Sequence, residues 1–211
     1  MTRTKPFRRL RLLAAAAVLA WAGAASAQEL RVGVRAGPEG IDPAYMALGN
    51  HSAAVKNMFD TLVWVDENLQ VQPGLAVSWR PIDESTWEFK LREGVKFHDG
   101  TELTAEDVVY SMERILAVKK GAYPLFATLV DPGSTRAVGK YAVEFNLKAA
   151  SAIFAATTHD VYVVNSALVK RNERNGDWGQ EWIARNDAGS GSYIIRRFDP
   201  ARGFLASRFD D

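Results

Sequence analysis

The alternation of apolar and charged side chains is most regular around residues 87–92. Trp87, Phe89 and Leu91 are spaced two apart, and charged residues occupy the positions between them. Successive side chains of a strand point to opposite faces, so a period of two is typical of a half-buried strand. This segment therefore predicts a strand with one face in a core.

A turn and a capped helix are predicted directly after this strand. Asp99-Gly100 signals the turn, because glycine accepts the positive φ that tight turns need. Thr104 occupies the position of a helix N-cap, and Asp107 follows it at the spacing of a capping box, although the usual acid is Glu. The buried face of the helix then repeats at i, i+4 and i+7, with Val108, Met112 and Ile115.

The same two periods predict further elements along the chain. Strands are expected at 30–34, 141–147 and 161–164, with hairpins pairing 63–65 with 69–71 and 194–198 with 204–209. Helices are expected at 53–62, at 149–158, from Asn165 to about 174 and at 178–184. A loop is expected at 119–124 and a turn at 131–134.

The N-terminus has the three parts of a secretory signal peptide. Five basic residues and no acid precede residue 12, an apolar run covers 12–22, and Ala25-Ser26-Ala27 supplies small residues for cleavage after Ala27. The run is too short for a membrane anchor, which needs about 20 residues. Residues 1–27 are therefore predicted to be removed. The residues flanking Arg8-Arg9 favour the general secretory route over the twin-arginine route.

Removal of this segment changes the charge of the protein. The whole chain has 26 Lys and Arg against 25 Asp and Glu, but five of the basic residues lie before residue 12. The mature chain is therefore acidic, and it has no basic stripe of the kind that binds nucleic acid. The chain has no cysteine, which excludes disulfides, thiolate metal sites and a lipid-modified N-terminal cysteine.

No set of residues suggests a catalytic or metal site. His51, His98 and His159 lie far apart, whereas a metal needs several converging ligands. His98 and Asp99 are neighbours on an extended segment, so their side chains face opposite sides and a catalytic dyad is not expected. Ser190 lacks the G-x-S-x-G spacing of a nucleophile elbow. We therefore expect no catalytic residue, no metal and no cofactor.

The tryptophans suit either a core or an aromatic ligand cleft. Trp87 lies on the alternating strand, so we expect it in the core.

Residues 87–115 resemble the signature region of a known family. The stretch WEFKLREGVKFHDGTELTAEDVVYSMERI is similar to that of the bacterial extracellular solute-binding proteins of family 5, the dipeptide and oligopeptide receptors of ABC importers. Three further landmarks of the family also match: Ile41-Asp42-Pro43 after the first strand, residues 57–79, and Gly189–Tyr193, where the family has G-T-G-P-Y. Trp64 and Trp79 match framework positions of the family, so the resemblance implies that they also lie in the core.

The resemblance implies a two-lobed α/β fold of the periplasmic binding protein type II-like kind. Family members are much longer, so the chain corresponds to their N-terminal part. Residues 28–48 would form the first segment of lobe I, 49–184 an accessory α/β subdomain, and 185–211 the truncated return to lobe I. The end of the chain in a strand just after a hairpin also favours truncation.

The implied function is binding rather than catalysis. A monomeric periplasmic receptor without a lipid anchor would close around a peptide or a similar small solute and then dock on the permease subunits of the importer. Position in the family places ligand contacts at Ala47, Leu48, Gly49 and Asn50, and the alternative is an ordinary surface loop. A secreted hydrolase-like enzyme and a stand-alone exported interaction module are the other hypotheses. Peptide, nickel, glutathione, opine and sugar ligands all stay open.

Overall fold

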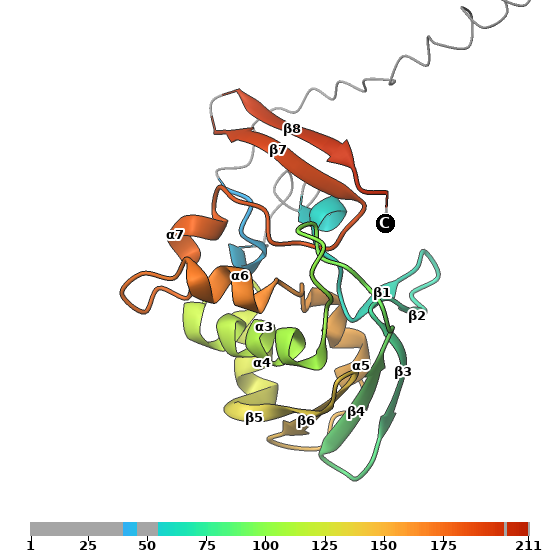
Figure 1. Ribbon diagram of the computed structural model, residues 1–211. Helices are drawn as coiled ribbons and strands as arrows, with labels where there is room; N and C mark the ends of the chain where they lie inside the picture. Colours follow the sequence, from blue (N-terminus) through green and yellow to red (C-terminus); the bar gives the residue numbers. More distant parts are fainter. Residues whose placement is uncertain (1–39, 46–54, 201, 211) are drawn as a thin grey trace, which may run out of the picture. The chain divides into compact units, whose positions relative to one another are not determined.

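The computed structural model describes residues 40–45, 55–200 and 202–210, which belong to one unit of the chain, Arg35–Asp211 (Figure 1). The strands are β1 (Val63–Val65), β2 (Val71–Pro73), β3 (Ala76–Pro81), β4 (Thr86–Leu91), β5 (Val130–Gly139), β6 (Ala142–Leu147), β7 (Tyr193–Asp199) and β8 (Gly203–Arg208). The helices are α3 (Ala105–Val118), α4 (Tyr123–Leu129), α5 (Phe154–Thr157), α6 (Ser166–Arg171) and α7 (Gln180–Ile183), with 3₁₀ turns η1 (Pro43–Tyr45) and η2 (Thr158–Asp160).

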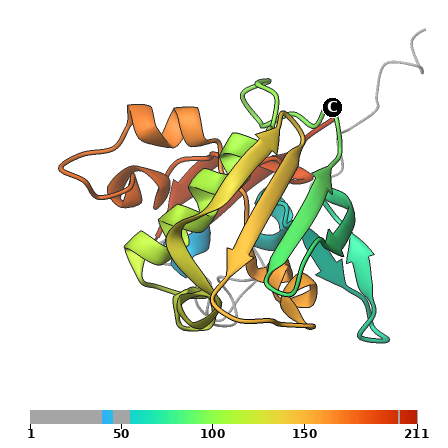
Figure 2. The same cartoon turned by 90° about the horizontal axis from the view of Figure 1, so that it is seen from below.

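The main sheet has four antiparallel strands in the order β3-β4-β6-β5. Phe89 of β4 lies opposite Trp79 on one side and Val143 on the other, so apolar residues of neighbouring strands form one inner face. Helix α3 packs on this face against β5 and β6, and Figure 2 shows the strands side by side with α3 behind them. The predicted half-buried strand at residues 87–92 is therefore confirmed.

The outer face of the sheet carries a row of charges. Arg80 of β3, Glu88 of β4, Glu144 of β6 and Arg136 of β5 lie opposite one another in register. The two arginines stand at the ends of the row. Arg80 bonds Glu88 at 2.9 Å, and Arg136 bonds Glu144 at 2.6 Å. The alternation that buries aromatic rings on one face thus puts the charged residues on the other.

Helix α3 begins and continues as the sequence predicts. The Asp107 carboxylate accepts a hydrogen bond from the Thr104 backbone N–H at 2.9 Å, which forms the predicted capping box with Asp as its acid. Val108 and Met112 are fully buried in the main core. The helix ends at Val118, and Lys119 adopts a left-handed conformation behind it.

Both predicted hairpins form, but the first has a shifted second strand. Strands β1 and β2 pair antiparallel, with β2 at Val71–Pro73 rather than at 69–71, and β7 pairs antiparallel with β8. Strand β8 ends at Arg208, before the last described residues rather than at the end of the chain. The predicted helices around 165–174 and 178–184 appear as the shorter α6 and α7, and the Asn165 side chain caps α6 by accepting from the Leu168 N–H.

Four expectations are wrong or only partly right. Residues 131–134 lie inside β5, where the pairing register shifts between Val130 and Thr135, so the turn signal produces a bulge. Residues 161–164 form no strand and contribute one bridge to Thr61, because their valines fill the core as an extended segment. The expected loop at 119–124 already contains the start of α4, and of residues 149–158 only Phe154–Thr157 is α-helical.

Trp64 is a further correction, because half of it is exposed rather than buried in the core. It faces away from buried Val63 on β1, and its indole N–H donates to the Pro73 carbonyl oxygen at 3.1 Å. Trp79 and Trp87 pack against the core as expected.

The predicted signal peptide, the strand at 30–34 and the start of the helix at 53–62 lie outside the described residues. Residues 55–58 are helical.

No helix among the described residues is long and apolar enough to cross a membrane.

Candidate functional site

The Asp42-Pro43 landmark forms a tight turn that is buried against the rest of the unit. The Asp42 carboxylate accepts from the Ala44 N–H at 2.9 Å, which is the local hydrogen bond expected of an aspartate that starts a turn. Pro43 begins the 3₁₀ turn η1, where its fixed φ is suitable. The predicted turn is confirmed, but the turn alone does not account for the burial of Asp42.

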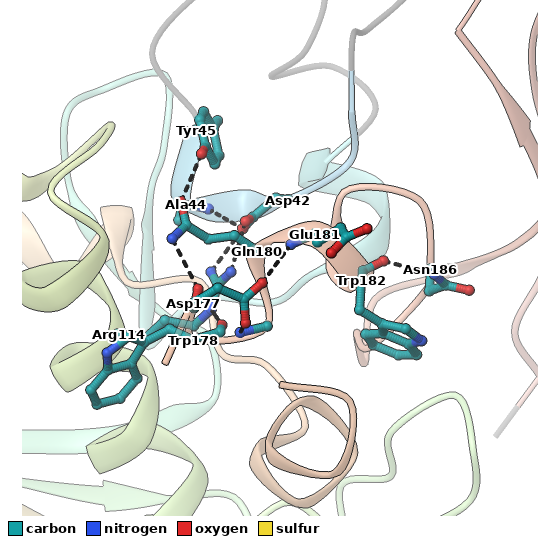
Figure 3. Close-up of polar contacts among 11 residues, drawn as sticks. Asp42, Ala44, Tyr45, Arg114, Asp177, Trp178, Gln180, Glu181, Trp182 and Asn186 are labelled. Atoms are coloured by element: carbon teal, nitrogen blue, oxygen red, sulfur yellow. Dashed lines mark hydrogen bonds and ion pairs between the residues drawn. The ribbon is translucent and has the colours of Figure 1, made fainter. Parts of the chain in front are cut away.

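Arg114 of α3 is the main partner of Asp42. Its two terminal nitrogens donate to the two carboxylate oxygens at 2.8 and 2.7 Å, and its Nε donates to the Trp178 carbonyl oxygen at 2.8 Å (Figure 3). Both charged side chains are almost completely buried. A bidentate pair in such a place fixes both position and orientation, so the turn at 42–45 is held rigidly against α3.

Arg114 belongs to a buried polar stripe on α3 that sequence reasoning missed. Asp107, Ser111 and Arg114 are spaced i, i+4 and i+7, and all three are buried. Ser111 Oγ accepts from the Val164 N–H at 3.0 Å, and Asp107 Oδ1 accepts from the Ser166 N–H at 3.0 Å. The helical spacing of these polar residues was the available signal, but such a stripe more often faces solvent.

Helix α7 provides a second attachment for residues 40–45. The Tyr45 hydroxyl donates to the Gln180 side-chain oxygen at 2.7 Å, and the Ile41 N–H donates to the Ala184 carbonyl oxygen at 3.0 Å. The Asp177 carboxylate caps the start of α7 by accepting from backbone N–H groups, including that of Glu181 at 3.0 Å. Partial burial opposes the charge of Asp177, but these hydrogen bonds keep its pKa below the ordinary value.

The helical residues 55–58 are held in place by the Gly189–Tyr193 landmark. The Gly191 N–H donates to the Met58 carbonyl oxygen at 2.9 Å. A Cβ at Gly189 would lie 1.9 Å from that same oxygen, and one at Gly191 would lie 2.7 Å from the Asn57 carbonyl oxygen. Only glycine fits so close to another backbone, which gives the two glycines of this landmark a physical reason.

The predicted ligand contacts Ala47, Leu48, Gly49 and Asn50 lie outside the described residues. The chain on either side of them is described, and it is anchored at both ends. Residues 40–45 are fixed by Arg114 and α7. Residues 55–58 are fixed by the Gly189–Tyr193 landmark, called the glycine segment below. The assignment of these four residues as ligand contacts stays a prediction.

His98 does not form a dyad with Asp99. Its Nδ1 lies 2.7 Å from Asp187 Oδ1 and its Nε2 lies 2.7 Å from the Gly191 carbonyl oxygen. Asp99 instead bonds Thr101 and the Asn165 side chain. The prediction that the two neighbours face different ways is therefore confirmed. Burial lowers the pKa of His98, but the bonds to Asp187 and Gly191 outweigh it, so the pKa lies above its ordinary value.

The other candidate groups are held in structural contacts. Ser190 is almost buried, and its hydroxyl donates to the Asp60 carboxylate at 2.8 Å. No three His, Cys, Asp or Glu side chains converge into a possible metal site within 40–45, 55–200 and 202–210. The geometry suits fixed backbone positions better than a chemical reaction.

Two cavities adjoin these contacts, and both are small. The one beside Pro43, Ser111 and Arg114 has a volume of about 20 Å³, which is room for about one water molecule. The one beside His98, Asn165 and Asp187 has a volume of about 150 Å³. Pockets that enclose a drug-sized ligand usually measure about 300–1,000 Å³, so neither cavity could enclose a peptide by itself.

Comparison with known proteins gives one consistent result. Residues 70–211 match the family model described as bacterial extracellular solute-binding proteins, family 5 Middle. The periplasmic murein peptide-binding protein MppA of Escherichia coli (strain K12) is 27% identical over 190 residues, which cover 82% of this chain and 34% of MppA. The probable D,D-dipeptide-binding periplasmic protein DdpA of the same organism is 30% identical over 178 residues, which cover 79% of this chain and 33% of DdpA.

Solved structures agree with this family match. The oligopeptide-binding protein AppA from Bacillus subtilis, in complex with a nonapeptide, superposes with a TM-score of 0.72 at 25% identity over 83% of this chain and 35% of AppA. The α/β class and the type II-like periplasmic binding protein fold are thus confirmed for the part that the chain spans. That part is about a third of the length of the curated relatives.

Proposed function

Because the chain belongs to the bacterial extracellular solute-binding proteins of family 5, we propose that it is the N-terminal part of the solute-binding component of an ABC importer. The observation that carries the proposal is the family match over residues 70–211. Family members are binding proteins, and we extend this to the chain by proposing that it binds its solute without chemical change. Its polar groups, which hold backbone segments in place, are in keeping with that role.

The ligand class we propose is a peptide. MppA and DdpA are both named for the peptides they bind, and AppA was solved with a nonapeptide. The mature chain is acidic, so it offers no basic surface for nucleic acid. We propose the periplasm as its location, with residues 1–27 as a cleaved signal peptide, no lipid anchor, and permease subunits as partners of a monomeric receptor.

The proposed organisation assigns residues 28–48 and 185–211 to lobe I and residues 49–184 to an accessory subdomain. The ligand contacts would be Ala47, Leu48, Gly49 and Asn50, where glycine would allow close approach of the ligand backbone. The anchoring of residues 40–45 and 55–58 supports this location, because it fixes where the segment between them begins and ends. Closure would follow because the ligand binds the closed state more tightly than the open one.

Native mass spectrometry of the protein released from the periplasm of a bacterial host tests this function. The proposal predicts a protein mass that begins at Gln28 and a second, heavier species carrying a peptide, which tandem fragmentation identifies. An uncleaved chain found only in the cytoplasm would contradict the location. A retained ligand of a different class would contradict the peptide assignment while leaving the binding role intact.

A further inference from the structure

The imidazole ring of His98 joins two segments that are about ninety residues apart in the sequence. His98 lies between β4 and α3. One of its two acceptors, Asp187, lies two residues before Gly189, and the other, Gly191, lies within the glycine segment. The His98 backbone N–H also donates to the Gly189 carbonyl oxygen at 2.9 Å. The His98 side chain is only 5% exposed, so bulk solvent has little access to these contacts.

Both ring nitrogens face an oxygen that can only accept. A carboxylate and a carbonyl oxygen each need a donor, and a neutral imidazole has one N–H whereas the cation has two. We therefore propose that His98 is a proton-operated latch, closed as the imidazolium and opened on one side by loss of a proton. The closed latch holds residues 189–193 on residues 97–99 through both ring nitrogens, whereas the open latch keeps the contact with Asp187 and loses the one with Gly191.

The partners of Asp187 determine which of the two ring nitrogens of His98 loses its proton. Its carboxylate also accepts from the Gly189 N–H at 2.9 Å and the Ile195 N–H at 2.8 Å, so it is fixed in place. The neutral ring keeps its remaining proton on Nδ1, where it faces this charge. Nε2 then presents a lone pair to the Gly191 carbonyl oxygen, and that contact becomes repulsive.

The other groups around His98 favour the cation. Asp60, which follows the helical residues 55–58, adds an attractive charge, and no basic residue is among the influences on the ring. Asp99 is adjacent in the chain, with its carboxylate occupied by Thr101 and Asn165. Phe209, after β8, packs edge-on against the ring at 4.9 Å. The latch therefore opens above the pH at which an ordinary histidine titrates, and stability is lost as the pH rises through that range.

Nitrogen NMR of the imidazole tests the latch directly in the unmodified chain. Between pH 5.5 and 9 we expect both ring nitrogens of His98 to be protonated at low pH, and Nε2 alone to lose its proton, above pH 6.5. A His98 that titrates below pH 6.5, the ordinary value of a histidine, or a neutral form protonated on Nε2, would overturn the proposal.

Thermal unfolding tests the consequence for the fold. The midpoint of the natural chain should fall by about 2–4 °C between pH 6 and pH 9 because one buried contact is lost, on the scale usual for a domain of this size. His98→Gln should remove this part of the pH dependence, whereas the matched change His159→Gln should keep it. Equal pH dependence in all three chains would show that the contact of His98 with Gly191 is not a latch.

Discussion

At the scale of single residues, the Asp42–Arg114 pair is the contact on which the placement of the first described segment depends. The pair joins positions 72 apart in the sequence and satisfies both carboxylate oxygens, while the Nε of the same arginine holds the Trp178 carbonyl. A buried ion pair adds little stability over an apolar replacement, but removal of one partner leaves an uncompensated charge. Its contribution is therefore to hold one geometry.

Replacement of Arg114 by Met should reveal that contribution. The change keeps the apolar stem and leaves the Asp42 carboxylate buried without its bidentate donor, so we expect a loss of about 3–5 kcal/mol in the free energy of unfolding. Urea unfolding followed by tryptophan fluorescence measures it. Arg136→Met is the matched control, because Arg136 pairs with Glu144 at the surface, where the expected loss is about 0–1 kcal/mol. Equal losses in the two variants would contradict the role given to Arg114.

At the scale of elements, α3 supports the molecule on two sides. Its apolar side packs on β5 and β6, and its polar stripe fastens Val164, the start of α6 and the turn at Asp42. The helix thus connects the sheet to segments that pack in a second apolar core, to which Ile41, Val164 and Val169 belong. The same stripe explains why α6, with only six residues, begins where it does.

The first turn of α3 allows a matched comparison of two carboxylates. Asp107→Ala removes the acceptor of the Thr104 and Ser166 N–H groups, whereas Glu106→Ala removes an exposed acid one position earlier. Both changes lose the favourable interaction with the helix dipole. Asp107→Ala should cost about 1–3 kcal/mol more, because buried donors lose their acceptor. Denaturant unfolding of the two variants measures the difference, and losses of the same size would show that the stripe is not structural.

The elements that follow from the sequence are those with a strong local signal. The period of two at residues 87–92 and the capped, apolar-faced α3 need no distant partner to be predicted. Residues 131–134 and 161–164 could not be predicted, because their conformation is set by pairing across the sheet and by filling of the core rather than by turn or strand propensity. Trp64 is exposed because of the direction in which β1 faces, which composition does not determine.

The contacts of the candidate site lie beyond sequence reasoning for a similar reason. His98 meets Asp187, and Arg114 meets Asp42, across 89 and 72 positions of the chain. Each residue considered alone suits a turn or a solvated helix face. Only the family resemblance, at Asp42-Pro43, residues 87–115 and Gly189–Tyr193, indicated that these positions matter, and the close approach of two backbones now explains the glycines.

At the scale of the whole molecule, the described unit is a framework that fixes the chain before and after the predicted ligand segment. It spans about a third of its relatives, so the complete receptor's cleft is a proposal and the framework is what this chain provides. The polar groups of the framework hold backbone to backbone, as a binding protein with defined geometry requires. The central proposal is accordingly that this framework takes part in binding a peptide without cleaving it.

Titration of the purified chain with trialanine, followed by tryptophan fluorescence, tests that claim most directly, with urea-unfolded chain as the control and mass spectrometry of the recovered peptide as a second readout. The account predicts a saturable change in fluorescence that is absent from the unfolded control, with trialanine recovered intact. A fluorescence change that never saturates, or recovery of the peptide as dialanine and alanine, would contradict it.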